Sequence, residues 1–146
     1  MIAKTSIPAN ASEKIPSGIR PDGSAYRVLV VDDSMFIAKQ LSQIFTSEGF
    51  EVIGTAADGA QGVERYKEMY PQIDLVTMDI TMPVMDGVTA LEKIMEFDKN
   101  AVVIMVSALG KEDVVKKSLM TGAKSYIIKP LDRNKVLDRV VTFLKR

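Results

Sequence analysis

The sequence predicts an α/β fold, a doubly wound parallel sheet of five strands with five helices in the strand order 2-1-3-4-5. From residue 27 onward, short runs rich in Val and Ile alternate with longer amphipathic stretches at helical spacing. Five strands separated by helices need crossover connections, which make the sheet parallel and cover both of its faces. The repeat of 22 to 28 residues per strand and helix, with right-handed crossovers, favours this strand order.

The first three strands share short β-branched runs, and we expect them at 27 to 31, 50 to 56 and 75 to 78. A helix is expected over 35 to 48, because Ile37, Leu41 and Phe45 recur at helical spacing. A second helix is expected over 60 to 70, where Pro71 closes it.

The second half repeats the alternation. Helix 88 to 97 is followed by a strand over 101 to 106, the longest apolar run of the chain. Helix 112 to 120 is expected to stop at Gly122, and a strand at 125 to 128 follows it. The last helix is expected over 134 to 145, capped by Asp132.

Composition bounds the chemistry. The 146 residues are 47% hydrophobic and 26% charged, with 19 basic and 19 acidic side chains, which is typical of one globular domain. The absence of Cys and His excludes disulfides, thiolate or imidazole metal sites, Ser-His-Asp triads and a phosphorylated histidine within this chain. No apolar run approaches the length of a membrane span and no secretory signal is visible, so we expect a cytoplasmic protein without membrane contact.

The two ends differ from the middle. Residues 1 to 26 hold three of the six prolines and no periodicity, so we expect a flexible N-terminal extension before a domain at 27 to 146, with a packing or partner-binding arm as the alternative. Residues 27 to 110 carry six basic and thirteen acidic side chains, whereas 111 to 146 carry ten and four. The basic end either steers an acidic partner or is an ordinary solvated surface. No helix-turn-helix pattern follows the domain, so no nucleic-acid partner is expected.

Polar residues follow four of the predicted strands. Asp32 and Asp33 end the first strand, Asp79 the third, Ser107 the fourth and Lys129 the fifth. The carboxyl ends of parallel strands share one edge of the sheet, where ligands bind between the first and third strands. Asp33 alone would read equally well as a helix cap, and Ser107 alone as a strand-end hydroxyl.

Together these residues suggest phosphoryl chemistry. Three neighbouring carboxylates repel one another unless a cation lies among them, and Mg²⁺ is the ion that suits oxygen ligands beside a phosphate. Lys129 and Ser107 supply a cation and a hydroxyl that can hold phosphoryl oxygens. Asp79, central in the sheet, would then be the nucleophile, because carboxylates form aspartyl phosphates.

Four sequence blocks resemble the response-regulator receiver family. They are VVDDS at 30 to 34, MDITMPVMDG at 78 to 87, VSA at 106 to 108 and KPL at 129 to 131. The resemblance covers 27 to 146, and the strand order 2-1-3-4-5 is known from the same family, so the two predictions are not independent.

The resemblance implies roles for the site residues. It makes Asp79 the phosphoacceptor and gives Mg²⁺ the ligands Asp32, Asp33, Asp79 and the backbone carbonyl of Thr81. It makes Lys129 the phosphate-binding lysine, followed by a cis peptide bond.

The resemblance also implies a switch. Ser107 would be the switch hydroxyl and Tyr126 the switch aromatic, with a strand aromatic packed in the core as the alternative for Tyr126. Phosphorylation would alter the surface formed by the fourth helix, the fifth strand and the fifth helix.

Within the family, the chain most resembles the single-domain chemotaxis receivers. That likeness implies a monomeric signalling protein rather than an enzyme, with a CheA-type histidine kinase, the flagellar switch protein FliM and a chemotaxis phosphatase as partners. One alternative is a phosphorelay intermediate that passes its phosphoryl group to another histidine protein. A haloacid-dehalogenase-type phosphohydrolase is a remote alternative, because the second Asp of that family is replaced by Thr81 here.

Overall fold

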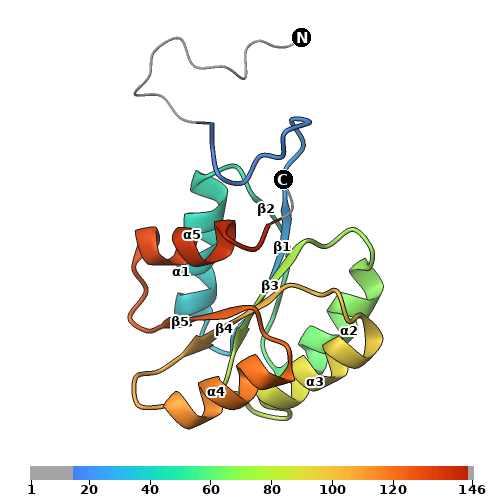
Figure 1. Ribbon diagram of the computed structural model, residues 1–146, viewed down its shortest axis with the longest axis vertical. Coiled ribbons are helices and arrows are strands. Elements are labelled where there is room, and N and C mark those ends of the chain that lie inside the picture. The colour runs from blue at the N-terminus through green and yellow to red at the C-terminus, as the bar shows by residue number, and fades with distance from the viewer. Residues whose placement is uncertain (1–14, 145–146) are drawn as a thin grey trace.

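The computed structural model describes residues 15 to 144, and within them the chain folds as one five-stranded parallel sheet flanked by helices (Figure 1). The strand order is β2-β1-β3-β4-β5, as the sequence predicts. The strands are β1 (Arg27–Val31), β2 (Glu51–Ala56), β3 (Leu75–Asp79), β4 (Val103–Ser107) and β5 (Ser125–Ile128). β4 begins two residues later than expected and includes Ser107. β1 and β3 pair directly, so their carboxyl ends lie side by side.

The helices lie close to their expected positions. They are α1 (Met35–Ser47), α2 (Gly59–Met69), α3 (Gly87–Phe97), α4 (Glu112–Thr121) and α5 (Arg133–Val141). All except α4 have a side-chain cap in which a carboxylate or hydroxyl accepts a backbone N–H of the first turn, from Ser34, Asp58, Asp86 and Asp132. Gly122 ends α4 at a φ of 132°. α5 ends at residue 141, earlier than the periodicity predicted, and turns follow as far as residue 144.

The helices cover the sheet unequally. α1 and α5 lie on one face, and α2, α3 and α4 lie on the other (Figure 1). On the first face Leu41, Phe45 and Val136 meet the strands, and each is buried. On the second face Leu91 and Ile94 occupy the equivalent place. Successive strand residues point to alternate faces, so Asp32 and Asp79 lie on the α1 and α5 side.

Residues 15 to 26 pack against the domain, where the sequence predicted a flexible extension. Tyr26 is 1% exposed and belongs to the core on the α1 and α5 side. Gly18 donates its backbone N–H to the carbonyl of Glu48 at 2.7 Å, and Arg20 forms an ion pair with Asp74. The segment is held by turns, backbone hydrogen bonds, this ion pair and the buried ring of Tyr26, and periodicity does not reveal such contacts. Residues 1 to 14 of the expected extension lie outside the described residues.

No helix between residues 15 and 144 is long and apolar enough to cross a membrane.

Candidate functional site

Three carboxylates meet where β1 and β3 end. Asp32 and Asp33 follow β1, and Asp79 ends β3; one oxygen from each lies within 4.8 Å of the others. Among the described residues this is the single acidic cluster with the geometry of a metal site. Asp32 and Asp79 are 3% and 5% exposed, whereas Asp33 is exposed. The cluster therefore opens to solvent on the Asp33 side.

Lys129 supplies the positive charge of the site. Its Nζ lies 3.2 Å from Asp79 Oδ1 and 3.5 Å from Asp32 Oδ2. The lysine follows β5, and its side chain reaches over β4 to β3. The peptide bond to Pro130 is cis, as the family resemblance implied. One cation thus faces a group of three carboxylates.

Burial, reinforced by the surplus of negative charge, raises the pKa of Asp79 and Asp32. Burial raises the pKa of Asp79 to about 6, helped by the charge of Asp32 and opposed by Lys129. Burial also raises the pKa of Asp32, against the hydrogen bond that Asp32 accepts from the backbone of Ser34 and the charge of Lys129. Lys129 alone therefore leaves both groups above their ordinary pKa.

The donor set fits a magnesium ion. Asp32 Oδ2 is buried, and the Lys129 ammonium at 3.5 Å is too distant to give it a close hydrogen bond, so a second cation among the carboxylates would supply the interaction it lacks. Carboxylate oxygens are the hard ligands that Mg²⁺ prefers, and the exposed side of the cluster leaves room for water or phosphate ligands. Thr81, whose backbone carbonyl is expected as the fourth ligand, lies in the exposed loop that leaves Asp79.

Ser107 and Tyr126 lie on the other side of the sheet edge. Ser107 is 1% exposed, and its hydroxyl donates to the carbonyl of Ala108 at 2.9 Å. Tyr126 is half-buried and packs against the core on the α2, α3 and α4 side. The guanidinium of Arg139 lies 5.1 Å from the centre of its ring, a contact the sequence did not reveal. The structure thus brings Lys129 and the three carboxylates together, whereas the hydroxyl of Ser107 is hydrogen-bonded to the Ala108 carbonyl.

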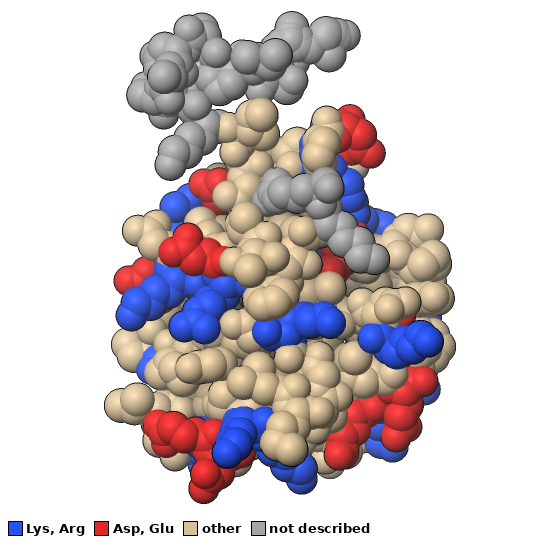
Figure 2. Space-filling model, viewed as in Figure 1, with Lys and Arg blue, Asp and Glu red and all other residues tan. Residues whose placement is uncertain are grey.

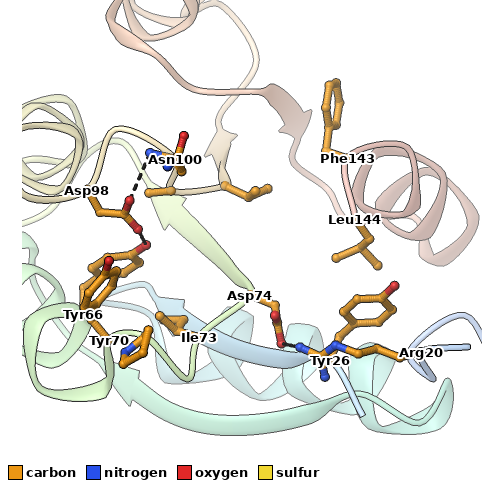
Figure 3. A pocket seen from close by; sticks show the side chains of 13 residues that line it. Arg20, Tyr26, Tyr66, Tyr70, Ile73, Asp74, Asp98, Asn100, Phe143 and Leu144 are labelled. Carbon is orange, nitrogen blue, oxygen red and sulfur yellow. Dashed lines mark hydrogen bonds and ion pairs between the residues drawn. The ribbon is translucent and has the colours of Figure 1, made fainter. Parts of the chain in front are cut away.

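A separate pocket of about 320 Å³ lies at the opposite end of the sheet, where the strands begin (Figure 3). Its two carboxylates already have partners. Asp98 accepts a hydrogen bond from the hydroxyl of Tyr66 at 2.6 Å, and Asp74 is paired with Arg20. Figure 3 shows these two pairs on opposite sides of the pocket. We assign no ligand to this pocket, because both of its carboxylates are already paired within the protein.

A model of the response regulator receiver domain family matches residues 28 to 141. The chain belongs to the response-regulator receiver family. This decides between the receiver and the phosphohydrolase interpretations in favour of the receiver, a signalling domain.

Several curated relatives are named chemotaxis protein CheY. The chain is 63% identical over 145 residues to the chemotaxis protein CheY of Treponema pallidum, covering 99% of this chain and 100% of that protein. It is 47% identical over 116 residues to CheY of Bacillus subtilis, covering 80% of this chain and 95% of that protein. Among solved structures, the crystal structure of the CheX–CheY–BeF3–Mg²⁺ complex from Borrelia burgdorferi matches with a TM-score of 0.86 at 63% identity. That match covers 88% of this chain and 97% of that one.

Proposed function

We propose that this receiver takes a phosphoryl group onto Asp79 from the phosphohistidine of a CheA-type kinase and, once phosphorylated, binds the flagellar switch protein FliM. The cluster of Asp32, Asp33 and Asp79 facing Lys129 carries this proposal. A solved relative holds BeF3 and Mg²⁺, and the chain has no histidine to serve as its own donor. We place this signalling in the cytoplasm, with the protein as a monomer.

The transfer forms one bond and breaks one. An ionised oxygen of Asp79 attacks phosphorus, and the bond from phosphorus to the donor's imidazole nitrogen breaks, with the electron pair remaining on the nitrogen. Lys129 lies 3.2 Å from Asp79 and is placed to neutralise charge on the transferring oxygens. When bound to Asp32, Asp33, Asp79 and the Thr81 carbonyl, Mg²⁺ supplies further positive charge to the same oxygens.

A bound cation favours the ionised form of Asp79, which is the form that attacks phosphorus. A pKa of about 6 leaves part of the population protonated and unreactive just below neutral pH. A cation among the carboxylates favours the charged form, so loading the site keeps Asp79 ready to attack.

The proposed switch couples the site to a partner surface. Ser107 would leave the carbonyl of Ala108 to donate to a phosphoryl oxygen, and Tyr126 would move into the space that Ser107 vacates. A pocket of about 310 Å³ lies beside Tyr126, between α4 and β5, and includes Leu109, Val115 and Leu119. A change at Tyr126 alters this pocket, which supports the α4, β5 and α5 surface as the place where a partner segment binds.

Charge on the molecular surface is mixed. Figure 2 shows basic and acidic side chains interspersed with uncharged areas on the face in view.

The phosphatase partner is supported by the relative solved in complex with CheX. A phosphorelay intermediate stays the alternative, and binding of the phosphorylated protein to an amino-terminal FliM peptide distinguishes the two.

The test of the phosphorylation site uses acetyl phosphate as a small donor. We expect the intact mass to rise by one phosphoryl group with Mg²⁺ and not with EDTA. Asp79→Asn is expected to abolish the gain, whereas Asp113→Asn, an exposed carboxylate on α4, keeps it. Phosphorylation of the Asp79→Asn protein, or phosphorylation without Mg²⁺, would contradict the proposal.

A further inference from the structure

The loop that leaves Asp79 contains a strained turn. Met85 donates its backbone N–H to the carbonyl of Pro83 at 2.7 Å, and Val84 between them has a φ of 67°. This combination is that of a γ-turn with a positive central φ, which is rare and strained. A β-branched residue is especially unfavourable there. The side chain of Val84 is 85% exposed, so its own packing does not offset the strain.

Two glycines hold the loop in this path. Gly59, the first residue of α2, donates its N–H to the carbonyl of Met85 at 3.0 Å, and a Cβ at Gly59 would lie 2.3 Å from that oxygen. Gly87 donates to the carbonyl of Ile80 at 2.7 Å, and a Cβ there would lie 2.0 Å from the carbonyl oxygen of Asp79. Any larger residue at either position would push the loop away.

A strained turn persists only where contacts with the surrounding structure hold it, and such turns occur mostly at functional sites. The path held here begins at Asp79 and includes Thr81, whose backbone carbonyl belongs to the proposed metal site. The same path ends at Gly87, where the loop returns to within contact of Asp79. The loop is thus closed at its base by Gly87 and fixed at its far end by Gly59.

We propose that Gly59 is a positioning residue for the Mg²⁺ site, although it lies on another element and touches no carboxylate. Its contact with Met85 maintains the strained turn at Val84 and thereby keeps the Thr81 carbonyl in place before the metal binds. The inference rests on the proposed function, because it assumes that Mg²⁺ binds at Asp32, Asp33 and Asp79.

The test compares two glycines of one helix. In Gly59→Ala the new methyl group displaces the carbonyl of Met85, and we expect the Kd for Mg²⁺ to rise about tenfold, the lower end of the effect usual for groups that support metal ligands. Gly62→Ala is the matched control, because the atoms nearest to a Cβ there belong to the Val31 side chain, at 3.0 Å, and not to the backbone of the loop. We expect its Kd to stay within about twofold of the original. Isothermal calorimetry on the full chain measures both constants, and circular dichroism verifies folding.

A second readout separates positioning from general damage. At saturating Mg²⁺, phosphorylation of Gly59→Ala by acetyl phosphate is expected to keep its rate within about twofold, because the metal then holds the loop. An equal loss of rate at all Mg²⁺ concentrations, with Kd unchanged, would overturn the proposal.

If Gly59→Ala does not fold, Val84→Gly tests whether the strained turn orders the loop for Mg²⁺ binding. Gly adopts a positive φ freely, so we expect the melting temperature to rise by a few degrees. The freed loop must then be ordered by the metal, and the Kd for Mg²⁺ is expected to rise several-fold. Val84→Ala keeps the backbone constraint and serves as its control, with a Kd near the original. Wild-type affinity in a folded Gly59→Ala overturns the inference, as does wild-type affinity in Val84→Gly where Gly59→Ala does not fold. Absence of Mg²⁺ binding by the wild type overturns the proposed function itself.

Discussion

Replacing Asp79 by Asn is expected to stabilise the protein in metal-free buffer, by an amount that grows with pH. Burial and the neighbouring Asp32 raise the pKa of Asp79 from its ordinary 3.8 to about 6 in the folded state. The unfolded chain therefore loses this proton at lower pH than the folded protein does. A raised pKa in the folded state means that stability is present below about pH 3.8 and is lost as pH rises through about 6.

The magnitude follows from the difference between the two pKa values. About two pKa units at roughly 1.4 kcal/mol each give a cost of about 3 kcal/mol at pH 7. At pH 4 the same two values give a cost of only about 0.5 kcal/mol. Asn has nearly the same shape and no charge, so Asp79→Asn is expected to recover most of this difference.

Urea denaturation of both proteins in EDTA, followed by circular dichroism at pH 4 to 7.5, measures the effect. Comparing the two proteins at each pH cancels the titration of groups that they share. Asp33→Asn is the control, and its gain is expected to be smaller because Asp33 is exposed. Added Mg²⁺ is expected to stabilise the wild type and to reduce the advantage of Asp79→Asn. If the gain in unfolding free energy of Asp79→Asn did not depend on pH, or were absent at neutral pH in EDTA, ionisation of Asp79 would not destabilise the folded protein.

Three further changes test other parts of the molecule. Gly18→Ala is expected to lower the free energy of unfolding by about 1–3 kcal/mol, because its methyl group would lie 2.3 Å from the backbone nitrogen of Phe50. Phosphorylation is expected to stay unchanged, and an unaltered stability in urea would mean that the close packing at Gly18 is dispensable. Tyr66→Phe removes the hydrogen bond to Asp98, and a loss of about 1–2 kcal/mol in urea denaturation is expected; a gain in stability would contradict that bond's importance. Lys129→Met is expected to slow phosphorylation by acetyl phosphate about 100-fold in a mass-spectrometric time course, and an unchanged rate would remove Lys129 from the site.

The candidate site was largely predictable because it depends on the ends of regular elements. Once β1 and β3 are placed as neighbouring parallel strands, Asp32 and Asp79 must lie at one edge. Lys129 follows β5 in the same way, and the structure places its ammonium within 3.5 Å of both carboxylates. Hydrophobic periodicity therefore carries most of the information needed to assemble the charged groups.

The loops were less predictable. Nothing in the sequence indicates that Gly59 and Gly87 approach the backbone of the β3 to α3 loop, since a glycine in a sequence does not reveal which distant atom it lies against. The orientation of the Ser107 hydroxyl toward Ala108, and the position of Arg139 beside Tyr126, depend on rotamers chosen by packing. Residues 15 to 26 were expected to be flexible because their contacts have no period.

The sequence by itself determined the order of strands and helices, the buried faces of those elements and the identity of the residues at the carboxyl edge of the sheet. These follow from local rules, since alternation, helical spacing and capping act over a few residues. Only the tertiary structure decided how the carboxylates share one lysine, how far burial raises the pKa of Asp79 and which glycines hold the loop beside it. Those properties depend on distances between atoms far apart in the chain, and such distances exist only once the two faces of the sheet have been covered.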